Sequence, residues 1–227
     1  MLSNNKKKTC STRESLLRAA CEVFAAKGYR DATVAEICER AAANIAAVNY
    51  HFGDKENLYR EAWRMSFQES MEKYPPDGGV GPDAPLEQRF RAHVLAMLQR
   101  GVDPDSFEFE IMLKEFANPT GLLFEVVHQS LEPLRQRFLA LIRGLLGPQA
   151  SDQQLEMCMM SVRSQCFDVR HLARHRRLTP KPELAPPSVV DSVGLEVVAD
   201  HIVRFSLAGI RDIRNQIQTE NCNQSYK

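Results

Sequence analysis

The 227-residue chain lacks most features that would set it apart from ordinary globular proteins. Its formal net charge is zero, so the chain as a whole has no signature of a polyanion-binding protein. No apolar run approaches the roughly 20 residues that a membrane-spanning helix needs, and no apolar segment of a secretory signal precedes Glu14. The six cysteines form no CxxC pair, which argues against a disulfide framework. We therefore expect a cytoplasmic protein with reduced thiols and no membrane partner.

The sequence motifs of common enzyme classes are also absent. There is no nucleophile elbow, P-loop, dinucleotide fingerprint or HExxH motif, so we expect neither catalysis nor a cofactor. His171 and His175 lie four residues apart on one helix face, as metal ligands can, but the four arginines within residues 170–177 disfavour a cation. We interpret this region as basic surface and expect no metal site. A sensing role for these histidines, or for Cys158 and Cys166, stays open.

The stretch from Thr33 to Phe52 predicts two short helices joined by a tight turn of small residues. Thr33 can cap the first helix, and Glu36 can close a capping box. Asn44 can cap the second helix, at about residues 45–51, which has small side chains at its leading end and hydrogen-bonding groups farther along. A helix of this kind can enter the major groove of DNA, so the pattern predicts a helix-turn-helix. A helical hairpin inside an all-α core would give a similar pattern.

The remainder of the chain has helical periodicity and no useful strand-period segment, which predicts an all-α fold. One helix is expected from Ser11 or Thr12 to Gly28, and another from Asp54 toward Tyr74. The following segment, YPPDGGVGPDAP, cannot continue a helix because it holds four prolines and three glycines. Further helices are expected at residues 86–100, 106–117, 121–146 (kinked or split at Pro133), 152–175 and 188–217.

These breaks divide the chain into five predicted parts. They are a flexible basic arm at 1–10, a helix-turn-helix domain at 11–74, a linker at 75–85, a second helical domain at 86–218 and a flexible tail at 219–227. The arm carries three consecutive lysines and is either a solvated tail or a contact to phosphates or a minor groove. Residues 1–60 hold ten Lys and Arg against seven Asp and Glu, so duplex affinity would depend on geometry and dimerisation more than on bulk charge.

Four motifs lie in or beside the predicted helix-turn-helix: FAAKGY before it, TVAEI and YHF within it, and DKENLY after it. Taken together over roughly residues 12–62, they resemble the DNA-binding domain of the TetR family of transcriptional regulators. The segment NIAAVNYHF and the later KEFANPT, at residues 114–120, look like the CecR-type branch of that family. The residues that carry the resemblance are Phe24, Gly28, Tyr29, Thr33, Ile37, Ala41, Tyr50, His51, Phe52, Lys55, Leu58 and Tyr59.

The resemblance implies a ligand-responsive regulator, in most cases a repressor, that binds a palindromic operator as a homodimer. The helices at 152–175 and 188–217 would form the dimer interface, as the last two long helices do in the family. In the family, residues matching Lys55 and Tyr50 contact the DNA backbone, whereas His51 could reach a phosphate or pack beside Phe52. The expected DNA contacts are Thr33, Asn44, Ile45, Ala46, Ala47, Asn49, Tyr50, His51 and Lys55.

The resemblance also implies that a small, partly apolar effector binds the second domain and releases the protein from DNA. The middle helices are rich in Phe and Met, which form core in most proteins but can also line an adaptable pocket. His128, Glu132 and Gln165 are the polar candidates for orienting a ligand. The expected lining residues are Phe107, Met112, Phe116, Phe124, His128, Glu132, Met160 and Gln165.

Two alternatives to a repressor stay open. A transcriptional activator would have the same sequence features. An all-α binding or scaffold protein without operator recognition is favoured only by the excess of Asp31, Glu36 and Glu39 over Arg40 around the predicted turn.

Overall fold

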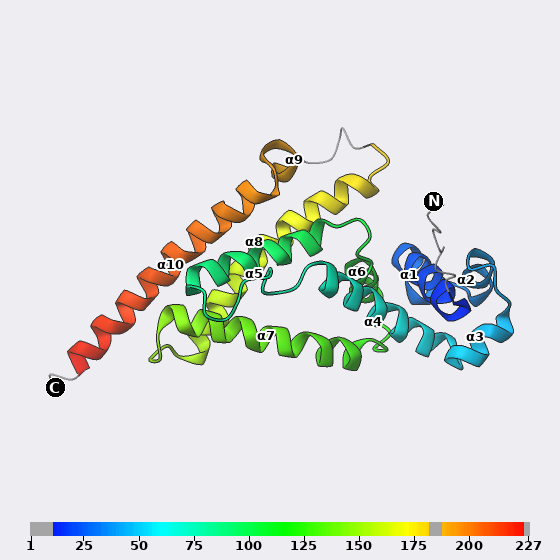
Figure 1. Cartoon of the computed structure of the whole chain (residues 1–227), viewed down its shortest axis with the longest axis horizontal. Coiled ribbons are helices and arrows are strands. Elements are labelled where there is room, and N and C mark those ends of the chain that lie inside the picture. The colour runs from blue at the N-terminus through cyan, green and yellow to red at the C-terminus, as the bar shows by residue number, and fades with distance from the viewer. Residues whose placement is uncertain (1–10, 182–187, 225–227) are drawn as a thin grey trace, which may run out of the picture. The chain divides into compact units, whose positions relative to one another are not determined.

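A computed structural model describes residues 11–181 and 188–224, except for the side chains of residues 175, 177, 178, 223 and 224. The predicted arm at residues 1–10 lies outside the described residues. Within these ranges every regular element is a helix, which confirms the all-α prediction (Figure 1). The helices are α1 (Thr12–Asp31), α2 (Val34–Arg40), α3 (Ile45–Phe52), α4 (Lys55–Lys73), α5 (Leu86–Val102), α6 (Glu108–Ala117), α7 (Phe124–Leu146), α8 (Asp152–Leu178), α9 (Val189–Val193) and α10 (Leu195–Gln224).

Contacts divide the chain into two compact units. Unit 1 comprises the chain up to Glu69 together with Asp105–His128, and unit 2 comprises Ser70–Pro104 and the chain from Gln129 onward. Residues 105–128, which include α6, thus pack with the N-terminal helices. The predicted domains at 11–74 and 86–218 stay predictions, because compactness does not establish which segments fold independently.

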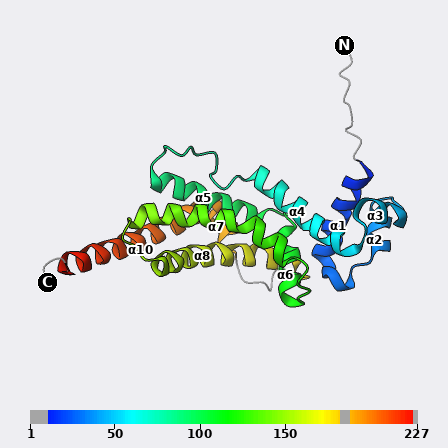
Figure 2. The ribbon, with the colours of Figure 1, turned by 90° about the horizontal axis from the view of Figure 1, so that it is seen from below.

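Unit 1 has one apolar core. The stripe predicted on α1 is buried, from Leu16 to Phe24, and the rest of the core comes from α2, α3, α4 and residues 111–126. Phe24 and Tyr59 meet edge to face, with ring centroids 4.7 Å apart, and Trp63 stacks on Phe67 at 5.2 Å. α1 is interrupted at Gly28, whose φ of 76° is open to glycine at little cost. α1, α2 and α3 contact one another, and Figure 2 shows them gathered together in unit 1.

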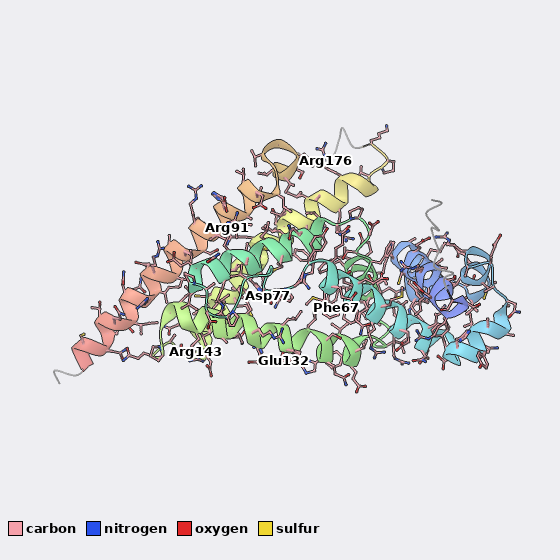
Figure 3. All side chains as sticks on the ribbon, in the orientation of Figure 1. Phe67, Asp77, Arg91, Glu132, Arg143 and Arg176 are labelled. Carbon is pink, nitrogen blue, oxygen red and sulfur yellow. The ribbon has the colours of Figure 1, made fainter. Side chains whose placement is uncertain are left out.

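Unit 2 is organised around α5, α8 and α10, which contact one another in pairs. Their inner faces, together with the second half of α7, form a second apolar core that includes Phe90, Ile142, Val162 and Ile202. At its surface the Arg91 guanidinium joins α5 to α10, donating to Asp200 at 2.7 Å and to Glu196 at 2.8 Å (Figure 3). Apolar residues recur at helical spacing along α5, α8 and α10 because each of these helices packs against the core over most of its length.

Three details of the expected helices differ or are narrowed. α7 is one helix through Pro133, so the expected split is wrong, and the expected kink stays a prediction. The helix expected at residues 188–217 is divided into α9 and α10 at Gly194, which has a φ of 84°. The Gly194 N–H caps α9 by donating to the Val190 carbonyl at 2.8 Å. α10 then continues to Gln224, so helix covers most of the range predicted as a flexible tail. In the described part of the chain no helix is both long and apolar enough to cross a membrane.

Candidate nucleic-acid interface

The two helices of the predicted helix-turn-helix are α2 and α3, and each begins with the expected cap. The Thr33 hydroxyl accepts from the Glu36 N–H at 3.2 Å, and the side-chain amide oxygen of Asn44, Oδ1, accepts from the Ala47 N–H at 2.9 Å. These bonds satisfy backbone donors that have no partner inside the helix. The side chains of Thr33 and Asn44 are therefore already used in capping, although both residues are exposed.

The turn between α2 and α3 depends on a left-handed residue that is not glycine. Ala42 has a φ of 50°, its N–H donates to the Glu39 carbonyl at 3.1 Å, and the next N–H, of Ala43, donates to Cys38 at 2.9 Å. These two bonds form a Schellman motif, which ends α2 sharply. The small side chains predicted for the turn are thus explained by its backbone, since a bulky residue at Ala42 would be strained.

α3 has one face in the core and one in solvent. Val48 and Phe52, four residues apart, are buried, and Ala47 is half-buried. Ile45 and Tyr50 are exposed to 53% and 84%, and Ala46 and Asn49 are exposed beside them. A helix fixed by one face on a rigid core can present the opposite face to a DNA groove.

Lys55, at the start of α4, is held by an aromatic ring that the sequence did not point to. Its Nζ lies 4.4 Å from the centroid of the Tyr29 ring, a cation–π contact. Burial lowers the pKa of the Lys55 ammonium, while Asp31 acts in the opposite sense. Asp54 caps α4 by accepting from the Asn57 N–H at 2.7 Å. The charge of Lys55 is thus fixed at a helix N-terminus, where a phosphate is favoured.

His51 lies half-buried between two aromatic rings. Its ring centroid is 4.9 Å from that of Tyr50 and 6.1 Å from that of Phe52, both edge to face. The expected packing of His51 beside Phe52 is thus present in the structure, and its contact with a DNA phosphate stays a prediction.

One of the three acidic residues around the turn, Glu36, is paired with nearby cations. Glu36 pairs with the Lys27 ammonium at 2.7 Å and with the Arg40 guanidinium at 3.9 Å, and Arg40 also reaches Glu22 at 3.1 Å. Such surface pairs add little stability. They do reduce the local negative field, which weakens the one observation in favour of a scaffold protein. The pairs of Lys27 with Glu36 and of Arg40 with Glu22 join different helices and leave no signal in the spacing of the sequence.

The KEFANPT segment docks on the DNA-binding helices within unit 1. The buried Glu115 carboxylate accepts from the Tyr59 hydroxyl at 3.1 Å and from the backbone N–H groups of Thr120 at 2.8 Å and Gly121 at 2.9 Å. The Arg30 guanidinium donates to the Asn118 side chain at 3.1 Å and to the Pro119 carbonyl at 3.2 Å. This motif therefore joins α6 to α1 and α4, a role that sequence reasoning missed.

The eight residues predicted to line a ligand pocket have mixed positions. In unit 1, Phe107 and Met112 are half-buried against the core, whereas Phe116 and Phe124 are 71% and 79% exposed, and His128 stacks on Phe124. In unit 2, Glu132 accepts from the Arg135 guanidinium at 3.0 Å.

The other two predicted lining residues also belong to unit 2. Met160 is 61% exposed, and the Gln165 amide donates to the Ser206 hydroxyl at 3.3 Å. The pocket remains a prediction.

A surface hollow of about 380 Å³ in unit 2 has a different lining. It lies between α7 and α8, and its Arg135 and Arg143 are paired with the carboxylates of Glu156 and Asp152 (Figure 3). None of the eight predicted residues lines this hollow. Its charged walls would suit a polar molecule better than the partly apolar effector that we expected.

The thiols and histidines of α8 give no positive sign of a sensing site. Burial raises the pKa of the Cys166 thiol to about 12 and also raises that of Cys158, so both stay protonated at neutral pH. The His171 ring stacks on Phe167, with centroids 6.2 Å apart, and the side chain of His175 lies outside the described residues. In the described part of the chain no three metal-ligating side chains cluster.

Comparison with known proteins identifies the class to which this interface belongs. Residues 16–62 match the family described as bacterial regulatory proteins, tetR family. The chain belongs to the TetR family and is a helix-turn-helix DNA-binding regulator of transcription, which confirms the resemblance seen in the sequence. More particularly, residues 86–210 match the C-terminal domain of the HTH-type transcriptional dual regulator CecR, so the second half is of the CecR type.

Individual relatives agree with this assignment. TtgW of Pseudomonas putida, an uncharacterised HTH-type transcriptional regulator, is 31% identical over 133 residues, which are 58% of this chain and 92% of that protein. The HTH-type transcriptional regulator SrpR of Pseudomonas putida is 30% identical over 60% of this chain and 59% of its own length. CecR of Shigella flexneri is 26% identical over 63% of this chain and 68% of its own.

Solved structures share the fold. A putative transcriptional regulator from Pseudomonas aeruginosa PAO1 has a TM-score of 0.65 at 18% identity, covering 88% of this chain and 93% of its own. A transcriptional regulator from Rhodococcus sp. Rha1 has a TM-score of 0.62 at 21% identity, over 88% of this chain and 97% of its own.

Proposed function

We propose that the protein is a repressor that binds a palindromic operator as a homodimer and leaves it when a small, partly apolar effector binds. The observation that carries the proposal is the face of α3 opposite the core, where Ile45, Ala46, Asn49 and Tyr50 are all exposed on a capped, rigidly packed helix. Lys55 and the backbone N–H groups at the start of α4 would bind a phosphate beside the groove.

Exposed apolar side chains on α8 and α10 support dimerisation. Met160 and Phe167 of α8, and Val197 and Phe205 of α10, are between 47% and 66% exposed although both helices also contribute to the core of unit 2. A two-fold interface through these helices would bury that surface and bring two copies of α3 to successive major grooves.

The packing of residues 105–128 in unit 1 supports control by an effector. Glu115 attaches α6 to α4, Arg30 of α1 binds the segment that follows α6, and α7 continues from this segment into unit 2. An effector that favours a different position of α6 would shift the DNA-binding helices with it, so DNA and effector would bind in opposition. Which genes respond, and to which molecule, would follow from the operator.

A selection of genomic fragments with the purified protein tests the proposal directly. At near-physiological salt we expect sequencing of the bound fragments to recover one palindromic motif, with affinity at least about a thousandfold above random duplex. Adding candidate effectors should release that DNA. No enrichment with or without effectors would contradict the proposal and favour a scaffold protein.

The activator alternative needs a separate readout. A reporter gene placed behind the recovered operator should be more active when the regulator is absent. Lower reporter activity in its absence would instead identify an activator that uses the same interface.

A further inference from the structure

The composition of α3 restricts which bases it can read. The helix, IAAVNYHF, contains no Lys, Arg, Asp or Glu. Arg and Lys make the commonest specific contact to guanine, and Asp and Glu accept from the cytosine amino group. Both charged routes to a G·C pair are therefore missing from α3.

The exposed face of α3 instead carries an aliphatic group beside an amide. Ile45 and Asn49 are four residues apart, which makes them neighbours on one helix face. Ile45 is 53% exposed, and the exposed Asn49 amide makes no hydrogen bond to another described residue. Asn44 differs, because its side-chain amide oxygen accepts the Ala47 N–H.

We propose that α3 reads A·T pairs, with Ile45 packing on a thymine 5-methyl group and Asn49 donating to adenine N7 while accepting from its N6 amino group. Among the base edges of the major groove, only thymine offers a methyl group, and adenine is the base whose edge pairs bidentately with Asn. Each operator half-site would then have A·T pairs under α3. This inference rests on the proposed function and adds to it the identity of the bases.

Replacing single thymines by uracil in the selected operator tests the role of Ile45, because it removes one methyl group and leaves base pairing intact. For the wild-type protein, uracil at one position of a half-site should weaken binding about fourfold, the value of one buried methyl group. Ile45→Ala should bind the thymine operator more weakly and lose nothing further with uracil. Leu113→Ala, an exposed apolar position of α6 in the same unit, should behave as wild type.

Replacing adenine by 7-deazaadenine tests the role of Asn49, because it removes the N7 acceptor alone. The wild-type protein should lose about fivefold or more at one position, whereas Asn49→Ala should lose nothing further. Thermal unfolding followed by the fluorescence of Trp63, the single tryptophan, should be the same for both variants as for wild type, since both side chains are exposed.

The possible failures are distinguishable. Absence of any selected operator would contradict the proposed function itself. An operator whose affinity is unchanged by every uracil and every 7-deazaadenine substitution would overturn the base assignment and leave the regulator intact. If uracil weakened the binding of wild type and of Ile45→Ala by the same factor, Ile45 would not be the residue that contacts the thymine methyl group.

Discussion

Lys55 is a cation whose position is fixed before any DNA is bound. The Tyr29 ring lies under its ammonium group at 4.4 Å, so little side-chain freedom is left to lose on binding a phosphate. Partial burial removes some of the water around the ammonium group and thereby lowers the pKa of Lys55. At the scale of single residues, such preorganisation makes Lys55 a better phosphate ligand than a freely solvated lysine.

Replacing this lysine should weaken binding to all DNA alike. We expect Lys55→Ala to lower affinity for operator and random duplex by the same factor, because phosphates carry no direct sequence information. The slope of log K against log salt should become less negative by about two per dimer, because each subunit loses one phosphate contact. Fluorescence anisotropy over a range of KCl concentrations measures both quantities.

Lys181→Ala, at an exposed lysine of unit 2, is the matched control and should leave both quantities unchanged. A change in base preference on Lys55→Ala would rule out a pure backbone contact.

At the scale of elements, α6 is the least expected part of unit 1. Its sequence period is that of any amphipathic helix, yet a buried carboxylate fixes it to α4. Glu115 is 8% exposed, and its oxygens accept hydrogen bonds from the Tyr59 side chain and from the backbone at Thr120 and Gly121. Burial, with the nearby Glu115 charge second, raises the pKa of the Tyr59 hydroxyl, which therefore stays a donor. A buried charge is tolerated only with this many partners.

Removing the hydroxyl should show how strongly α6 is attached. We expect Tyr59→Phe to lower the free energy of unfolding by about 1–2 kcal/mol and Glu115→Gln by about 2 kcal/mol. The double variant should lose less than the sum, because both changes remove one shared bond. Urea unfolding followed by Trp63, which is buried in the same core, reports on unit 1.

Glu39→Gln, at an exposed carboxylate of α2, should change stability by less than about 0.5 kcal/mol. Strict additivity of Tyr59→Phe and Glu115→Gln would mean that the two side chains do not act together.

At the scale of the whole molecule, the proposed function depends on a second copy of the chain. One recognition helix covers few base pairs, whereas two related by a two-fold axis read two half-sites with a fixed spacing. The exposed apolar side chains of α8 and α10 are the surface available for that pairing.

Phe205→Glu should therefore produce monomers. A carboxylate placed where Phe205 is now 66% exposed would be buried without a partner in a dimer, so self-association should weaken more than about tenfold. Light scattering after size exclusion measures the mass, and operator binding should weaken in parallel. Gln218→Glu adds the same charge at an exposed polar position of α10 and should remain dimeric. A dimeric Phe205→Glu protein would place the interface elsewhere.

Much of this protein follows from its sequence alone. Thr33 and Asn44 predicted both caps of the helix-turn-helix, because capping is a contact between residues three positions apart. The apolar stripes predicted the helices and the buried face of α1 for the same reason: helical periodicity is local. The family resemblance came from such local motifs as well.

The tertiary structure decided what depends on contacts between distant segments. The partnership of Tyr29 with Lys55 and of Tyr59 with Glu115 joins residues 26 and 56 positions apart, and no period in the sequence relates them. The same is true of the place of α6 in unit 1. The tertiary structure also decided the backbone conformation at Ala42 and Gly194, which both have a positive φ. Glycine allows such an angle at little cost, whereas nothing in the sequence points to it at an alanine.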